Sequence, residues 1–187
     1  MKALSEMTLE ELWQLFPIIL TPHQENWAQQ YAKEAARIAA FMPTRDVARI
    51  SHIGSTAIAG IWAKPIVDIL LEVPETTAFS EMRRVLTENG YICMNQSETR
   101  MSFNRGYTPA GFAEEVFHLH LRRAGDCDEL YFRDYLNEFT ETAQAYEKLK
   151  LDLWKRFEHD RDAYTREKTA FVMAHTQRAK ERYDGRY

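Results

Sequence analysis

The stretch ISHIGSTAIAGIWAKPIVDILLEV, residues 50–73, decides the fold. Residues 50–53 are a short run of the types that favour β-strands, and Gly54 with Ser55 closes this run. Residues 66–73 are a second and longer run of the same kind, with a proline at its entrance, where a strand tolerates one. The pattern predicts a strand, a tight turn, a short connection and another strand.

The second of these strands carries carboxylates on one face. Because side chains alternate along a strand, Asp68, Leu70 and Glu72 share one face, while Ile69 and Leu71 share the other. We expect the second face to be buried and the first to carry charge. An acidic residue without a role would weaken a strand, so Asp68 is a candidate site residue.

Gly54, Ser55 and Asp68 have the chemistry of a phosphate and metal site. Glycine adopts backbone angles that other residues avoid, and the hydroxyl and N–H groups of Ser55 suit a phosphate. Mg²⁺ or Mn²⁺ is commonly held by one or two carboxylates together with substrate phosphate oxygens. Asp68 is the predicted metal ligand, and Glu72 or His118 completes the shell or acts as a base in this interpretation.

Two motifs connect this centre with a known family. HIGST at residues 52–56 and KPIVDI at residues 64–69 resemble the signature of the GrpB-like family, whose fold is similar to that of the nucleotidyltransferase superfamily. Members of the family also occur fused to dephospho-CoA kinase. The resemblance covers residues 18–172 and implies an α/β (α+β) fold: a nucleotidyltransferase-like mixed sheet flanked by helices, with a C-terminal helical extension.

The chain departs from the superfamily pattern at one position. That pattern places two acids one residue apart on the second strand, and Leu70 stands in the place of the second acid. This difference argues against a mechanism that needs two metal ions.

Two hypotheses about function follow. The first is a metal-dependent nucleotidyltransferase that binds a nucleoside triphosphate and transfers a nucleotidyl or phosphoryl group to a small acceptor, which the sequence does not identify. The second is a non-catalytic module that binds a nucleotide, another phosphorylated small molecule or a partner protein.

The whole chain has the size and composition of one globular unit. Its 24 basic and 28 acidic residues give a net charge of −4, so no overall basic field argues for nucleic acid as a partner. We expect a single domain over residues 1–187, with an α/β lobe to about residue 123 and a helical extension from about residue 124. The sequence leaves the oligomeric state open.

Cysteine usage and the N-terminal sequence bear on the compartment. Cys93 and Cys127 lack metal-type spacing, which is typical of a reducing compartment. The N-terminus has acids where a signal peptide needs an apolar core, and no apolar run is long enough to span a membrane. We therefore expect a cytoplasmic protein without a membrane partner.

Helix signals frame the central strands. Thr8 and Glu11 form a predicted capping box for a short helix. Thr21-Pro22 predicts the start of a second helix, in which Trp27 is a core anchor or, as the alternative, stacks on a ligand. Further helices are predicted over residues 78–89, 128–139, 142–157 and 163–182.

Three further strands are predicted over residues 91–94, 100–105 and 116–122, with an exposed loop over residues 106–115. The last strand carries His118 and His120, whose imidazoles point the same way. They are candidate catalytic residues or ligands beside Asp68, and the alternative is a pair of hydrogen-bonded core histidines. No further spacing of Cys or His supports a structural zinc site.

Long cationic side chains from separate segments form a predicted anion clamp around the acidic strand. Alternatively, their stems lie along the edge of the core while the charges reach water. The predicted phosphate-binding residues, together with Gly54 and Ser55, are Lys64, Arg100, Arg133, Lys150 and Lys168.

Overall fold

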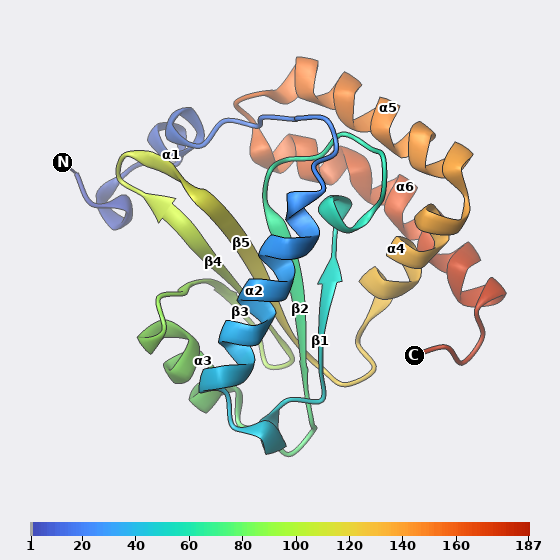
Figure 1. The fold of residues 1–187 in the computed structure, drawn as a ribbon. Helices are drawn as coiled ribbons and strands as arrows, with labels where there is room; N and C mark the ends of the chain where they lie inside the picture. Colours follow the sequence, from blue (N-terminus) through green and yellow to red (C-terminus); the bar gives the residue numbers. More distant parts are fainter. Residues whose placement is uncertain (1) are drawn as a thin grey trace.

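The computed structural model of the protein describes residues 2–187, and a five-stranded mixed sheet forms its centre (Figure 1). The strand order is β1-β2-β5-β4-β3, in which β2 and β5 are parallel and every other neighbouring pair is antiparallel. The strands are β1 Arg49–Ile53, β2 Val67–Val73, β3 Ile92–Gln96, β4 Arg100–Thr108 and β5 Gly111–Arg123. The prediction of a mixed sheet is therefore confirmed.

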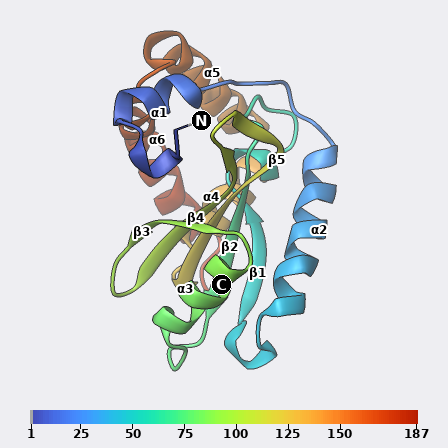
Figure 2. The ribbon, with the colours of Figure 1, turned by 90° about the vertical axis from the view of Figure 1, so that its left-hand side faces the viewer.

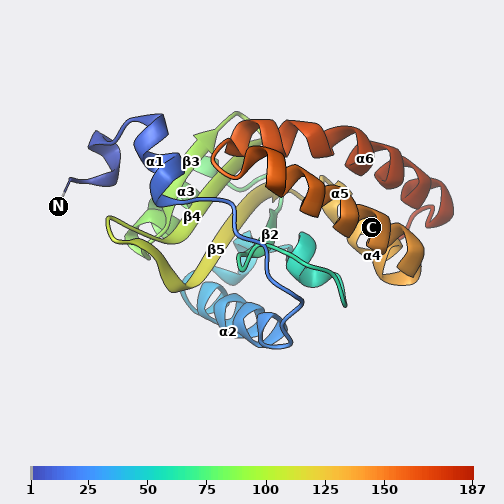
Figure 3. The same cartoon turned by 90° about the horizontal axis from the view of Figure 1, so that it is seen from above.

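Helices cover both faces of this sheet. Figure 3 shows α2 on one face and the C-terminal helices α4 to α6 on the other, and α3 packs on the same side as α2. None of the helices in residues 2–187 is both long and apolar enough to cross a lipid bilayer. The helices are α1 Leu9–Leu15, α2 Asn26–Phe41, α3 Phe79–Glu88, α4 Asp128–Glu138, α5 Thr140–Phe157 and α6 Arg161–Arg182.

Strand β2 is buried on both faces. Ile69 and Leu71 belong to the core under α2 and α3, where Trp27 is also buried, so Trp27 is a core anchor. Leu70 packs on the opposite side against α4 and α6. The face with Asp68 carries the two carboxylates as predicted, but it is buried as well, because the C-terminal helices cover Leu70 and Glu72 is enclosed in an ion pair with Arg49. Only the end of this face, at Asp68, opens into a cavity.

The second helix begins later than its local signal predicts. Thr21 forms an isolated bridge with Ala63, in which each backbone N–H donates to the other residue's carbonyl. The helix begins at Asn26, so Pro22 lies outside it. A pairing with a distant segment satisfies this backbone instead of helix formation. The first helix, in contrast, has the predicted capping box between Thr8 and Glu11.

The predicted loop over residues 106–115 is mostly strand. Strands β4 and β5 continue to a tight turn over residues 109–110, beside which α1 lies (Figures 1 and 2). The register shifts at Gly106, whose φ of +90° and close approach to the Glu115 backbone leave no room for a side chain. The prediction of a loop is therefore wrong, because the glycine in this stretch marks a β-bulge and not the end of a strand.

The remaining elements follow their predictions closely. The C-terminal chain forms three helices that pack on one another and on β1. Gly90 ends α3 with a φ of +85°, as the helix stop signal requires. These helices place α6 across the end of β2 and β5, where the candidate site lies.

Candidate functional site

Asp68 lies where three strands bring polar side chains together. The parallel register of β2 and β5 pairs Asp68 with His118 and Leu70 with His120. Nδ1 of His118 is 3.3 Å and Nε2 of His120 is 3.6 Å from Oδ1 of Asp68, whose side chain is 26% exposed. The structure thus brings together Asp68, His118 and His120, the three predicted catalytic residues.

Gly54 fits tightly against this carboxylate. It follows β1 with a φ of +71°, and a Cβ at this position would lie 2.8 Å from Cγ of Asp68. Both the backbone angle and the close approach require glycine. Ser55 then starts a short 3₁₀ turn, Ser55–Ala57, at the edge of the cavity. The turn after β1 is therefore shaped around Asp68.

His118 is held by a network that fixes its tautomer. Its Nε2 is 2.7 Å from the hydroxyl of Tyr107 and 3.2 Å from the guanidinium of Arg161. Because arginine only donates, Nε2 accepts, and the proton of a neutral ring lies on Nδ1, facing Asp68. Burial lowers the pKa of His118 even though Asp68 opposes this change, and this favours the neutral ring.

The carboxylate of Asp68 keeps its charge in this setting. Burial raises its pKa, but the contacts with His118 and His120 outweigh burial and hold the pKa well below its usual range. Asp68 is therefore an anion at neutral pH. It lies near the start of β2, whereas the other carboxylate of this strand, Glu72, lies near its end.

Four cationic side chains line a cavity of about 300 Å³ around Asp68. They are Lys64, Lys150, Arg161 and Lys168, and among the described residues Asp68 is the only acid in the lining. The ammonium groups of Lys64 and Lys168 lie 4.6 Å and 4.4 Å from the centre of the Tyr164 ring. A site with this excess of positive charge is suited to a polyanion.

The pKa values of the three lysines are lowered because the side chains are buried and close to other cations. Burial, with help from Lys168, lowers the pKa of Lys150 to about 7. Burial lowers the pKa of Lys168 to about 8, and it lowers that of Lys64 well below its usual value, with the neighbouring cations adding to the effect. Lys150 is 1% exposed and donates to the carbonyl of Trp62. A bound anion would relieve this repulsion.

A larger cavity of about 490 Å³ adjoins the cationic one. The two share Ser55, Asp68, His120 and Lys168. The pKa of Tyr146, which lines the larger cavity, is raised to about 12 by burial, so its hydroxyl is neutral. The apolar and aromatic part of the lining comprises Ile53, Phe132, Tyr146, Val172 and Met173. The polar part of the lining that the smaller cavity does not share comprises Asp128, Glu129, Thr176, Gln177 and Lys180. Asp68 and His120 thus lie between a cationic space and one of mixed character.

Residues 17–178, which contain this whole constellation, match the model of the family described as GrpB protein. The chain belongs to the GrpB family. Among its relatives are a UPF0157 protein of Pseudomonas aeruginosa, 35% identical, and a glutamate-rich protein GrpB of Alkalihalophilus pseudofirmus, 34% identical. Each alignment covers 83% of this chain, and the chain spans 64% of the length of the first relative and 91% of the second.

Solved structures agree with this assignment. The crystal structure of the conserved protein GrpB from Enterococcus faecalis has a TM-score of 0.76 and 26% identity, and the match covers 88% of this chain and 99% of that one. The Cid1 poly(U) polymerase, solved with Mg and 3′-dATP, has a TM-score of 0.50 and 10% identity over 79% of this chain and 46% of its own. The second likeness shows that this GrpB-family chain has a fold similar to that of nucleotidyltransferases.

Glu72 is not a metal ligand beside Asp68 in this GrpB-family chain. It lies four residues further along β2, about 13 Å away at the usual rise of a strand. Its side chain is 2% exposed and pairs with Arg49, and it accepts a hydrogen bond from the N–H of Gly125. The predicted metal role of Glu72 is therefore wrong, because its carboxylate is fully engaged at the other end of the strand.

Arg100 and Arg133 also lie outside the cationic cavity. Arg100 is opposite Arg122 at the far end of β4 and forms an ion pair of 2.6 Å with Asp126. Arg133 forms an ion pair of 2.7 Å with Asp134 and donates to the carbonyl of His52. Their predicted place in the anion clamp is wrong. Three residues of the predicted clamp do line the cationic cavity: Lys64, Lys150 and Lys168.

Two residues of the site were missed by sequence reasoning. Tyr107 lies in the stretch that was predicted to be a loop, and Arg161 precedes the predicted start of the last helix. A signal for Arg161 existed, because Asp160 caps α6 through the N–H of Ala163 and so makes Arg161 the first helical residue. Tyr107 had no such signal, since the bulge at Gly106 interrupts the strand pattern.

The metal prediction rests on Asp68. Within residues 2–187, no three His, Cys, Asp or Glu side chains are arranged to hold a metal ion by themselves. One carboxylate at a cavity fits the kind of Mg²⁺ site in which substrate phosphates and water supply the other ligands. The residues present therefore suit a metal ion that arrives with a phosphorylated substrate.

Proposed function

We propose that this protein binds a nucleoside triphosphate together with Mg²⁺ or Mn²⁺ and transfers a nucleotidyl or phosphoryl group to a small acceptor. The observation that carries the proposal is the convergence of Lys64, Lys150, Arg161 and Lys168 on a cavity in which Asp68 is the only acid among residues 2–187. The fold resemblance to a polymerase solved with Mg and 3′-dATP supports it only in general terms, since fold alone does not fix chemistry.

The cationic cavity is the proposed site of the phosphates. Three lysines and one arginine neutralise charge that develops on phosphate oxygens, and such electrostatic stabilisation dominates this class of reaction. Asp68 with phosphate oxygens would hold the metal ion, which supplies further charge neutralisation when it is bound. Ser55 offers its hydroxyl at the junction of both cavities. The larger cavity then accommodates the nucleoside.

His120 is the proposed proton acceptor. It lines both cavities, whereas Nε2 of His118 already accepts hydrogen bonds from Tyr107 and Arg161. In nucleotidyl transfer an acceptor oxygen bonds to the α-phosphorus, the bond from this phosphorus to the bridging oxygen breaks, and pyrophosphate leaves. The proton of the acceptor passes to His120. In phosphoryl transfer the same events occur at the γ-phosphorus, and the nucleoside diphosphate leaves.

A second function is favoured by one observation. Leu70 is fully buried against α4 and α6 in the place of the superfamily's second acid, so within residues 2–187 no second carboxylate lines the cationic cavity. This favours a non-catalytic module that holds a nucleotide or another phosphorylated ligand through the lysines alone.

Calorimetric titration with ATP, GTP, CTP and UTP, each with and without Mg²⁺ or Mn²⁺, separates the two functions. We expect metal-dependent binding of at least one nucleotide, and its loss in Asp68→Asn. Asp184→Asn, which makes the same change on an exposed residue, is the control and should bind as the wild type does. Binding that is indifferent to metal and to Asp68, or no binding of any nucleotide, would contradict the transferase and favour the non-catalytic module. Metal-dependent turnover of any nucleotide would rule the module out.

A further inference from the structure

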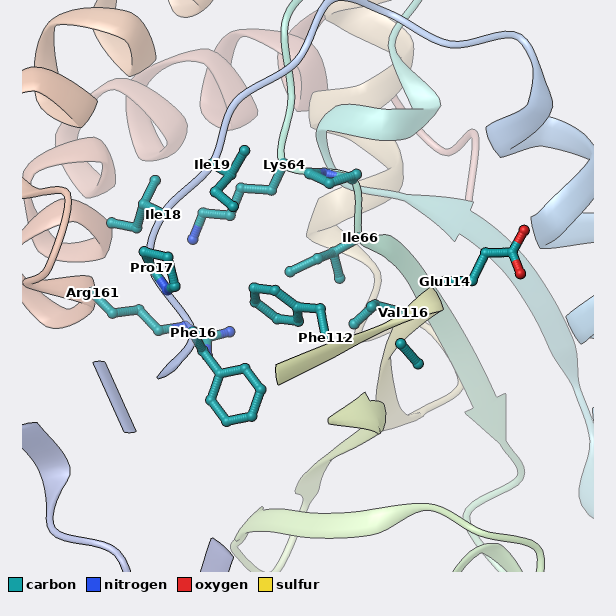
Figure 4. Close-up of a pocket in the computed structure, with 12 residues that line it drawn as sticks. Phe16, Pro17, Ile18, Ile19, Lys64, Ile66, Phe112, Glu114, Val116 and Arg161 are labelled. Atoms are coloured by element: carbon teal, nitrogen blue, oxygen red, sulfur yellow. The ribbon is translucent and has the colours of Figure 1, made fainter. Parts of the chain in front are cut away.

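A small apolar cavity of about 80 Å³ lies next to the cationic one (Figure 4). It is walled by the segment before α2, by the entrance to β2 and by the start of β5. The two cavities share Lys64, Ile66 and Arg161. The apolar side chains of its lining are Phe16, Pro17, Ile18, Ile19, Pro65, Ile66, Phe112, Ala113 and Val116.

Two cations face this apolar space. Figure 4 shows the ammonium of Lys64 and the guanidinium of Arg161 directed into the cavity, while the carboxylate of Glu114 points away from it. Within residues 2–187 the lining therefore combines an apolar wall with two positive charges that no acid in the cavity neutralises. A ligand that fits it has an anionic group next to an aliphatic one.

The wall of the cavity also reaches the network around Asp68. The ring of Phe16 lies 4.8 Å from that of Tyr107, whose hydroxyl contacts His118, and 5.0 Å from that of Phe112. A molecule in this cavity would therefore lie beside the groups that hold His118 and Asp68, and no residue of its lining also lines the larger cavity.

We infer that this cavity is the acceptor subsite: it takes the short aliphatic body of a small molecule whose anionic head, a phosphate or a carboxylate, lies between Lys64 and Arg161. The inference rests on the proposed function and names the acceptor class for it. An engineered apolar cavity of about 150 Å³ holds benzene, so this cavity accommodates a group of about three to five carbon atoms.

Binding of a chain-length series tests the subsite. The probes are inorganic phosphate and methyl, butyl and octyl phosphate, with acetate, pentanoate and nonanoate as the carboxylate arm, measured by calorimetry. Each methylene that enters the cavity should raise affinity about fourfold, as expected for about 0.8 kcal/mol per buried methylene, and the gain should stop near four carbons. The arm with the higher affinity identifies the head group.

Two variants test whether the gain in affinity with chain length arises in this cavity. Ala113 is exposed and lines the cavity, so Ala113→Leu should fill it and remove the gain with chain length, while inorganic phosphate binds as before. Ala110→Leu makes the same change at the turn of the same hairpin, outside the lining, and should keep the gain. Circular dichroism confirms that both variants fold.

The outcomes separate the subsite from the proposed function. If inorganic phosphate binds but affinity does not change with chain length in the wild type, the subsite is wrong and the phosphate site stands. An unchanged gain in a folded Ala113→Leu also overturns the subsite. If chain length matters but no nucleotide binds in the titration described above, the apolar cavity stands and the proposed transfer falls.

Discussion

The two carboxylates of β2 share a strand face but have opposite surroundings. Glu72 is fully enclosed, pairs with Arg49 and accepts from the N–H of Gly125. Asp68 is partly exposed, contacts two histidines and faces four cations that exceed its charge. At Glu72 the charges balance without a ligand, whereas at Asp68 they balance only when an anion arrives. The comparison teaches that incomplete charge compensation, rather than the presence of an acid on a strand, marks a site in this fold.

The largest effect on stability should follow from removing Glu72. Glu72→Ala leaves Arg49 without its partner and the N–H of Gly125 without its acceptor, which should cost about 3 kcal/mol of unfolding free energy. We take the lower end of the usual range because the side chain of Arg49 is 34% exposed and rehydrates in part. Urea unfolding measures the change.

Glu75→Ala is the matched control for this prediction, because Glu75 is exposed in a weak pair with Arg123. It should change stability by less than about 0.5 kcal/mol. Phosphate affinity should stay within about twofold of the wild type in Glu72→Ala, since a twofold change is only about 0.4 kcal/mol. A large loss of phosphate binding in folded Glu72→Ala would break the distinction between the two carboxylates.

The next effect comes from the glycine against Asp68. Gly54→Ala should lower the unfolding free energy by about 2 kcal/mol, because alanine is strained at a φ of +71° and its Cβ would clash with the carboxylate. Gly60→Ala is a sharp control: its φ is +74°, and nothing lies within 4 Å of the added Cβ. The difference in stability between the two variants isolates the close approach to Asp68, and equal losses would mean that the backbone angle explains everything.

Local patterns predicted the framework of the site correctly. The period of two along a strand placed His118 and His120 on one face, and the register of β2 and β5 then set both beside Asp68. The run of β-prone residues around Asp68 likewise predicted β2 to within a residue. Such features depend on neighbours in sequence, so the sequence is sufficient for them.

Which cations reach the site could not be predicted in the same way. Arg133 and Lys168 both lie on helices that pack near the sheet, but Arg133 donates to the carbonyl of His52 at the end of β1, whereas Lys168 reaches the cavity of Asp68 and forms no ion pair within residues 2–187. Arg100 pairs with Asp126, which lies in the turn between β5 and α4. These partners depend on tertiary packing and not on helical or strand spacing. The predicted start of the second helix at Thr21 failed for the same reason. Thr21 pairs with the distant Ala63, and the helix begins at Asn26.

Lys168 tests the excess of positive charge directly. Lys168→Met should weaken inorganic phosphate binding about tenfold, or about 1.4 kcal/mol, because one cation leaves the cavity. Stability should stay the same or rise slightly, since the variant removes a half-buried charge whose pKa is lowered by burial. Calorimetry and urea unfolding measure the two quantities on the same preparation.

The control for Lys168 is Lys148→Met, which makes the same substitution on an exposed face of α5. It should leave both phosphate affinity and stability close to those of the wild type. Equal losses of affinity in the two variants would show that net charge, and not the cavity, attracts the anion.

The smallest effect should be a dependence of anion binding on pH. Sulfate is a suitable probe because its charge is constant between pH 6 and 9. Lys150 and Lys168 have pKa values of about 7 and 8, and a bound anion favours their charged forms, so binding takes up protons. Sulfate affinity should therefore fall as the pH rises from 6 to 9, by about fivefold if each pKa rises by a fraction of a unit on binding.

Stability should move in the opposite direction over the same range. A lysine whose pKa is lower in the folded state than its usual value near 10.4 binds a proton more tightly when unfolded, so the unfolding free energy of the free protein rises with pH above about 7. Arg49 adds nothing to this change, because its hydrogen bond with Glu72 raises its pKa still further above the range. Urea unfolding and sulfate titration at each pH would show the two trends, and both should weaken in Lys168→Met. If sulfate affinity and unfolding free energy changed in the same direction with pH, the charges of the lysines would already be neutralised in the free protein, as the charge of Glu72 is by Arg49.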